Sequence, residues 1–165
     1  MMKQSLVLIG LLICLLIQSP LTQAKNLTNR LGIGMSNKYS FDMPSLAAQY
    51  YPNSEFGFTA ALGVDTRKDN SLFGIQGGIR RNIFEESNLN FYMGGTLSLI
   101  SVETAGNSES GFELNGVVGA EFFLTGLENL GFNFETGIGV ASLKSGTRFR
   151  TLGSDPFHAG IIFYF

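Results

Sequence analysis

Apolar and polar residues alternate with a period of two along most of this chain. Over residues 130–143, large apolar side chains such as Phe134 and Ile138 occupy every second position. Small or polar residues such as Asn133 and Glu135 fill the positions between them. This alternation places the two sets on opposite faces of a β-strand. The pattern therefore predicts strands with one apolar face and one small or polar face.

Eight segments carry this alternation, and residues that favour turns separate them. Most approach the roughly nine to eleven residues that a tilted strand needs to cross a bilayer. The predicted strands cover 29–37, 43–52, 55–65, 71–83, 89–101, 111–124, 130–143 and 157–165. The connections between them are short, and the outer loops at one end include 102–110 and 144–156. We expect an all-β fold, an eight-stranded antiparallel up-and-down barrel.

The environment of this barrel depends on which face points inward. Eight strands enclose only enough room for side chains or one small ligand, so the many Phe, Leu, Ile and Val side chains would not fit inside. With the small and polar face inward, lipid solvates the apolar face, and the fold is a transmembrane β-barrel. A soluble lipocalin-like barrel is the alternative, and it requires the opposite orientation.

Aromatic residues gather near the strand ends, which predicts two girdles at the membrane interfaces. One set is Tyr50, Tyr51, Phe56, Phe84, Phe91, Phe132 and Phe165, and the other is Tyr39, Phe41, Phe73, Phe112, Phe149 and Phe157. Arg81 is the one charge assigned to the outward face within a strand, close to the end where a long side chain can reach headgroups.

The composition agrees with a membrane barrel. Only 15% of residues are charged, whereas about a quarter is usual in soluble domains. No apolar run after residue 25 approaches the roughly 20 residues of a transmembrane helix. The formal net charge of −2 does not indicate a basic surface for nucleic acid.

The first 24 residues have the pattern of a signal peptide. Lys3 supplies a positive start, residues 5–17 an apolar core, and small residues ending at Ala24 a cleavage site. The apolar core is too short for an uncleaved anchor. We expect a mature barrel domain over residues 25–165, without Cys14, which is the only cysteine.

The chain ends on an apolar face and an aromatic residue. Alternate residues of the last strand, Phe157, Ala159, Ile161, Phe163 and Phe165, are all apolar. This ending resembles the C-terminal signature of Gram-negative outer-membrane β-barrels, and the chain as a whole resembles their small OmpA/OmpX-like members. The resemblance implies an outer-membrane location after cleavage, with lipid and lipopolysaccharide around the barrel. It also implies periplasmic chaperones and the outer-membrane assembly machinery as partners, which would read Phe157, Ile161, Phe163 and Phe165.

Polar residues of the predicted inward face form a candidate site in the lumen. Arg80, Glu121 and Glu135 fall in the same half of the barrel, so the guanidinium could bridge the two carboxylates and make their burial tolerable. The rest of the predicted lumen cluster is Gln76, Glu113 and His158. A structural plug that fills the barrel is the leading interpretation. A gated, cation-preferring pore is the alternative.

Nothing in the pattern predicts catalysis or a cofactor. His158 is the only histidine and has no serine close in sequence, unlike the lipid A deacylases of this barrel size. One histidine without thiolates lacks the ligands for zinc. We therefore expect a non-enzymatic protein with a structural or surface-interaction role and without metal. A narrow pore or OmpW-like conduit for hydrophobic solutes is the second hypothesis, and a lipid A-modifying enzyme is the third.

Overall fold

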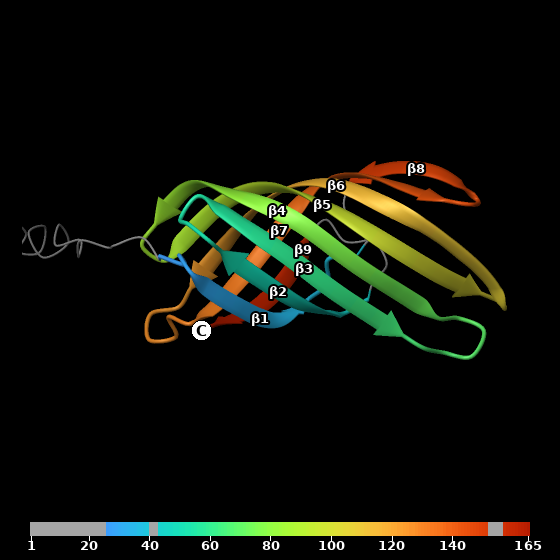
Figure 1. Ribbon diagram of the computed structural model, residues 1–165, viewed down its shortest axis with the longest axis horizontal. Helices are drawn as coiled ribbons and strands as arrows, with labels where there is room; N and C mark the ends of the chain where they lie inside the picture. The colour runs from blue at the N-terminus through green and yellow to red at the C-terminus, as the bar shows by residue number, and fades with distance from the viewer. Residues whose placement is uncertain (1–25, 40–42, 152–156) are drawn as a thin grey trace, which may run out of the picture.

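The computed structural model describes residues 26–39, 43–151 and 157–165, and its strands form a closed barrel (Figure 1). The predicted signal peptide lies outside the described residues. Eight strands make the barrel wall: β1 (Arg30–Ser36), β2 (Ser45–Tyr51), β3 (Phe56–Asp65), β4 (Leu72–Glu86), β5 (Leu89–Thr104), β6 (Asn107–Phe123), β7 (Leu130–Leu143) and β9 (His158–Tyr164). A short strand, β8 (Gly146–Thr151), adds to one edge.

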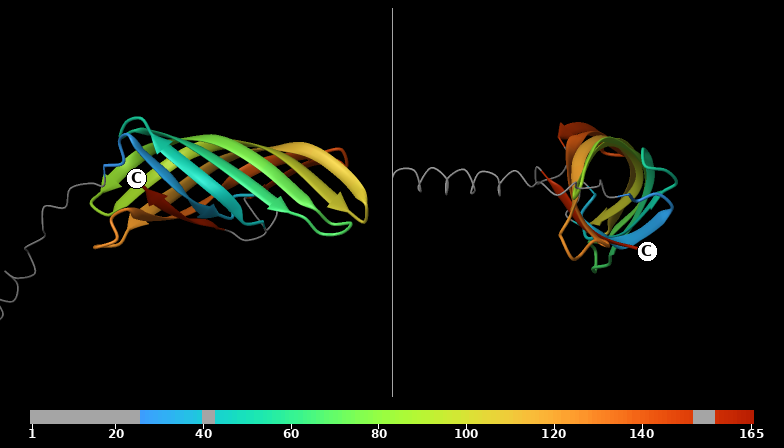
Figure 2. Two further views of the ribbon diagram at one scale, coloured as in Figure 1. Left: turned by 60° about the horizontal axis from the view of Figure 1, so that its bottom comes forward. Right: turned by 90° about the vertical axis from the view of Figure 1, so that its left-hand side faces the viewer.

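Each wall strand pairs antiparallel with its neighbours. Strands β1 to β7 follow one another around the wall, and β9 closes it by pairing with β7 on one side and β1 on the other. The view along the axis in Figure 2 shows the resulting ring. The predicted all-β fold with eight antiparallel barrel strands is confirmed.

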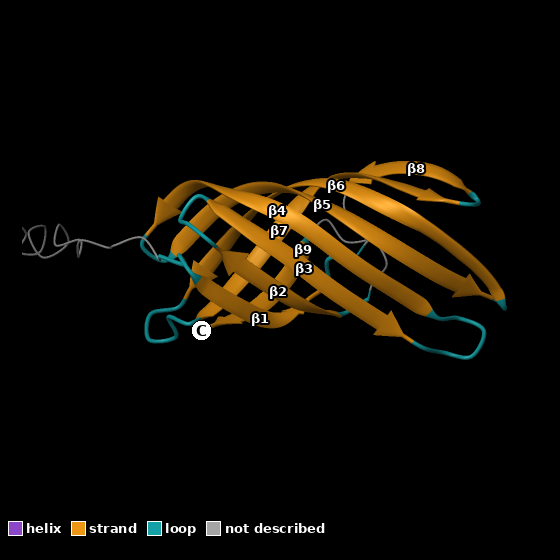
Figure 3. Cartoon of the chain, viewed as in Figure 1, coloured by secondary structure: helices purple, strands orange, loops and turns teal. Residues whose placement is uncertain are grey.

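The two ends of the barrel differ, as the colouring by secondary structure makes clear (Figure 3). The terminal end holds Asn26, Phe165 and the turns that follow β2, β4 and β6. The hairpin end holds the β3–β4, β5–β6 and β7–β8 connections. Strands β4 to β7 have 14 to 17 residues, whereas β1, β2 and β9 have seven each, so one side of the wall is much taller.

Two predicted loops at the hairpin end are instead largely strand. In the predicted loop 144–156, residues Gly146–Thr151 form β8, which pairs with residues 138–143 of β7. This edge is open because β9 pairs only with residues 130–135 of β7. In the predicted loop 102–110, β5 and β6 continue to a tight turn at Ala105 and Gly106, whose φ angles of 51° and 77° suit a two-residue hairpin.

Apolar side chains cover the outside of the wall and polar ones fill its inside. Among the described residues, thirty large hydrophobic residues are exposed and sixteen polar or charged residues are buried. Phe134 and Ile138 are 46% and 55% exposed, whereas Asn133 and Glu135 are buried. The predicted parity of this strand is thus confirmed. No helix among the described residues is long and apolar enough to cross a membrane.

The predicted aromatic girdles are wrong for two tyrosines. Tyr50, Phe56 and Phe165 are exposed on the outer wall, but Tyr39 and Tyr51 are buried inside the barrel. Tyr51 follows the inward parity of its strand, and both hydroxyls find hydrogen-bond acceptors in the lumen. Phe41 lies outside the described residues.

Candidate functional site: the barrel lumen

An ion pair crosses the middle of the lumen. Arg80 on β4 and Glu135 on β7 face inward, with 2.9 Å between Nη2 of Arg80 and Oε2 of Glu135. Nη1 of Arg80 also donates a hydrogen bond to Oε1 of Gln49 on β2, at 2.9 Å. Both charged side chains are at most 3% exposed. A buried charge is tolerated when it is paired and hydrogen-bonded in this way.

Tyr92 on β5 completes this unit. The guanidinium of Arg80 lies over its ring, 4.1 Å from the centroid, which adds a cation–π attraction. The hydroxyl of Tyr92 donates to Oε2 of Glu135 at 3.0 Å. The same carboxylate oxygen therefore accepts hydrogen bonds from both side chains.

A second cation, Lys38, approaches the same carboxylate. Its Nζ lies 3.9 Å from Oε1 of Glu135, and its side chain is 1% exposed. This residue lies one position beyond the first predicted strand, which covers 29–37. Its inward direction continues the parity of Ser36, which is also buried. Extending the predicted strand by one residue, with the same parity, would have found it.

Glu121 has a different set of partners from the one predicted. The expected bridge from Arg80 to both carboxylates is not formed, because the ion pair of Arg80 goes to Glu135. Tyrosine hydroxyls bind Glu121 instead, with that of Tyr164 2.7 Å from Oε1 and that of Tyr51 3.4 Å from Oε2. The two cations and two carboxylates in the middle of the lumen leave it charge-balanced.

Four tyrosine rings in the lumen lie against strand glycines, and for Tyr51, Tyr92 and Tyr164 the glycine belongs to the next strand of the wall. A Cβ atom on Gly57 would come within 2.6 Å of the Tyr51 ring, and one on Gly32 within 2.6 Å of the Tyr164 ring. The same relation joins Tyr92 to Gly119 and Tyr39 to Gly74. Such distances leave no room for a side chain. The inward glycines therefore provide the space that the aromatic rings fill.

Sequence reasoning missed the lumen tyrosines Tyr51, Tyr92 and Tyr164, although a signal was present. Tyr92 stands between Phe91 and Met93, and both of these are exposed. Parity alone places the middle residue inside. An inward glycine on the next strand would have been a supporting signal.

A cluster of buried apolar and aromatic side chains lies toward each end of the barrel. At the terminal end the buried cluster consists of Leu27, Ala47, Tyr51, Phe123, Ile162 and Tyr164. At the hairpin end it consists of Tyr39, Met43, Ala61 and Ile100. The hydroxyl of Tyr39 donates to the carbonyl oxygens of Ala61 or Gly74, at 2.8 and 2.9 Å. The connection after β1 thus contributes two buried side chains, Tyr39 and Met43, to this cluster.

The remaining predicted site residues all lie in the lumen but do not join the ion pair. Gln76 donates to Oγ of Ser98 at 3.0 Å, and Oε1 of Glu113 accepts a hydrogen bond from Asn115 at 2.9 Å. Arg150 on β8 comes within 3.7 Å of Oε2 of Glu113. His158 is buried, and its register partner in β7 is Glu135.

The arrangement has the chemistry of a packed polar interior. Among the described residues, no group of three or more His, Cys, Asp or Glu side chains is arranged to hold a metal ion. The fold and the lumen define a closed eight-stranded barrel whose interior carries a charge-balanced polar layer. No known family model matches this sequence, and comparison with curated proteins gives no match.

Proposed function

We propose that this chain is a non-enzymatic outer-membrane β-barrel of a Gram-negative bacterium, with a structural or surface-interaction role and a closed lumen. The proposal rests on the distribution of side chains, with large hydrophobic residues exposed on the wall and polar residues buried inside it. Thirty large hydrophobic residues face outward among the described residues, an apolar surface that water would drive to aggregate and that lipid tails solvate. The pairing of β9 with both β1 and β7 also closes the wall, which leaves no strand edge unpaired at that level, as a bilayer requires.

The C-terminal strand supports the outer-membrane location. Phe157, Ile161, Phe163 and Phe165 are between 46% and 65% exposed and share the outer face of the wall. They are therefore available to an assembly machinery that reads apolar alternation at the end of a chain. Lipid and lipopolysaccharide would surround the barrel after insertion.

The layered lumen supports a structural role over transport. The Arg80–Glu135 ion pair and the Tyr92 ring occupy the middle of the lumen, with an apolar cluster at each end. An ion that crossed this path would have to displace paired charges and enter apolar side chains, and both steps are unfavourable. Surface interaction would use the tall side of the wall, where Arg148 and Phe149 of β8 are exposed.

Two measurements on refolded mature protein test this proposal. Flotation with phospholipid vesicles should recover folded protein in the lipid fraction, and a soluble barrel would stay in the aqueous fraction. In planar bilayers, the inserted protein should give no discrete conductance steps. Regular steps would overturn the closed lumen.

The narrow pore is the second candidate, and one observation favours it. Asn90 and Asn133 are buried, and neither side-chain amide has a hydrogen-bond partner among the described residues. Nε2 of His158 and Nε2 of Gln49 are also buried without a hydrogen-bond partner among the described residues. Buried polar groups need partners, and water can supply them. Conductance steps in the bilayer experiment would favour this hydrated-lumen hypothesis.

A further inference from the structure

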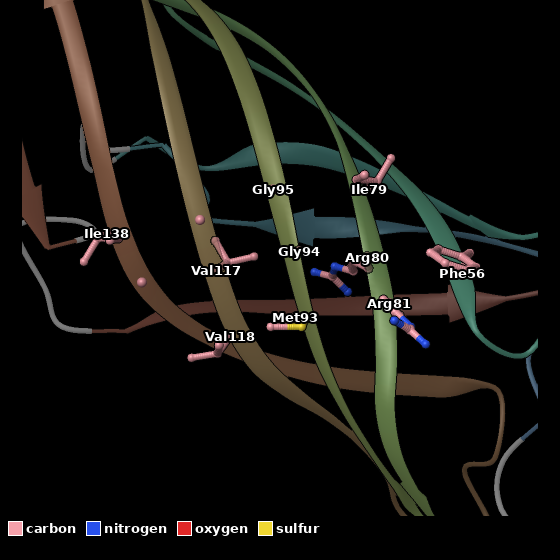
Figure 4. Close-up of a pocket in the computed structure, with 12 residues that line it drawn as sticks. Phe56, Ile79, Arg80, Arg81, Met93, Gly94, Gly95, Val117, Val118 and Ile138 are labelled. Carbon is pink, nitrogen blue, oxygen red and sulfur yellow. The ribbon is translucent and has the colours of Figure 1, made fainter.

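A groove of about 570 Å³ crosses the outer face of β4 to β7. Its volume lies in the range of sites that hold a small molecule. Close up, Phe56 and Arg81 lie at one side of it, and Val118 and Ile138 at the other (Figure 4). These four side chains point away from the barrel interior. The groove lies behind the lumen site, because the buried residues Arg80 and Val117 also contribute to its lining.

The groove exists because two neighbouring outward positions lack side chains. Ile79, Gly95, Gly116 and Ile138 are consecutive register partners from β4 to β7. A Cβ atom on Gly116 would have no neighbour within 4 Å, and one on Gly95 would meet only the carbonyl oxygen of Asn115, at 3.6 Å. The two isoleucines therefore stand as walls on either side of an open floor.

The cationic side chain of Arg81 lies beside this floor, in the next row of outward register partners toward the terminal end of the barrel. Phe56, Arg81, Met93 and Val118 are the register partners of that row. Arg81 is exposed, and its guanidinium lies 5.7 Å from the centroid of the Phe56 ring. Among the described residues, Arg81 has no carboxylate partner. The exposed guanidinium of Arg81 is therefore available to pair with an anion.

We propose that the groove binds one acyl chain of an anionic glycerophospholipid, whose headgroup phosphate pairs with Arg81. This inference rests on the membrane position proposed above. The apolar floor and walls suit a hydrocarbon chain, and small residues allow close approach of such a chain to the backbone. The guanidinium suits a phosphate, with which it can form paired hydrogen bonds.

Charge favours a lipid over a second copy of the chain. A dimer formed at the groove would be related by a two-fold axis, so the groove of one copy would face the groove of the other. That contact would bring two Arg81 side chains to one interface, where the groove lining contributes no carboxylate. Like charges at such an interface are unfavourable.

Native mass spectrometry of the refolded mature protein tests the proposal. The protein is released from detergent containing equal amounts of phosphatidylglycerol and phosphatidylethanolamine. The test variants are Gly116→Leu, which fills the floor, and Arg81→Gln, which removes the charge. Gly77→Leu is the matched control, because Gly77 also has nothing within 4 Å of its Cβ position but does not line the groove.

We expect one retained phosphatidylglycerol on the unmodified protein and on Gly77→Leu. Gly116→Leu should retain about tenfold less, a change that corresponds to about 1.4 kcal/mol. Arg81→Gln should still hold lipid but lose about fivefold of its preference for phosphatidylglycerol, the effect of one basic residue near an anionic surface. Gly95→Leu should reproduce the result of Gly116→Leu and serves if that variant does not fold.

Equal lipid retention by all variants would overturn the inference and reduce the lipid to a non-specific layer. A dimer that disappears in Gly116→Leu would also overturn it, since the groove would then be an interface between copies. Failure of the protein to float with vesicles would instead overturn the membrane proposal itself.

Discussion

The guanidinium of Arg80 lies 4.1 Å from the ring centroid of Tyr92, and the hydroxyl of that tyrosine donates to Glu135, the ion-pair partner of the arginine. Three side chains from β4, β5 and β7 thereby form one unit across the lumen. Each satisfies part of the hydrogen-bonding or charge requirement of the other two. The stability of the barrel should therefore depend on them together.

Removing the guanidinium should destabilise the barrel strongly. Arg80→Met leaves the buried Glu135 with Lys38, at 3.9 Å, as its remaining ion-pair partner among the described residues, and loss of one partner of a buried ion pair typically costs about 3–5 kcal/mol. Arg80→Met with Glu135→Gln should recover part of this loss, because the two sites are coupled. Urea unfolding in lipid vesicles, followed by circular dichroism, measures both free energies.

Arg81→Met is the matched control for this experiment, because Arg81 is the next residue in the same strand and faces outward. Its effect should stay below about 1 kcal/mol, as for a lipid-facing arginine near the membrane interface. An unchanged stability in Arg80→Met would mean that Glu135 is solvated by water, and would favour the pore hypothesis.

Inward and outward glycines should respond oppositely to alanine. A Cβ on Gly57 would lie 2.6 Å from the Tyr51 ring, so Gly57→Ala should overpack the lumen and destabilise by about 1–3 kcal/mol. A Cβ on Gly77 has nothing within 4 Å, so Gly77→Ala should be neutral or stabilising by up to about 1 kcal/mol. Equal effects in unfolding experiments would refute the proposed role of inward glycine as space for tyrosine.

The parity of β7 predicts how four single-cysteine variants react in the inserted protein. Cysteine at Phe134 or Ile138 should react with a lipid-soluble maleimide, because both positions face outward. Cysteine at Asn133 or Glu135 should resist that reagent, because both positions are buried in the lumen. Mass spectrometry gives the labelled fraction. Preferential reaction of Phe134 and Ile138 positions with a water-soluble reagent would argue for a soluble barrel.

Deletion of Phe165 should slow or abolish insertion into the outer membrane while export across the inner membrane continues. The residue is 65% exposed at the end of the outer face. Phe149→Ser is the control, because Phe149 on β8 is 69% exposed but belongs to no barrel-wall strand. The amount of folded protein in the outer-membrane fraction is measured by comparing the gel mobility of unheated and heated samples. Normal outer-membrane levels of the deletion variant would contradict the assembly role.

Alternation along the chain is sufficient to predict the strands and the direction of most side chains. Successive side chains of a strand point to opposite faces, so a run of alternating residues assigns each one to a face without any knowledge of its neighbours. Alternation assigns Arg80, Glu121 and Glu135 to the inner face, together with Gln76, Glu113 and His158, and all six are buried. The same rule would have placed Tyr92 and Tyr164.

Which inward side chains contact each other depends on the tertiary structure. The partners of Arg80 depend on the stagger between strands and on how far each side chain reaches across a narrow lumen, and neither follows from alternation along one strand. The guanidinium therefore pairs with Glu135, while Tyr51 and Tyr164 bind Glu121. The pairing of β8 with β7 also depends on the tertiary structure, because β9 leaves residues 138–143 of β7 without a partner on that side.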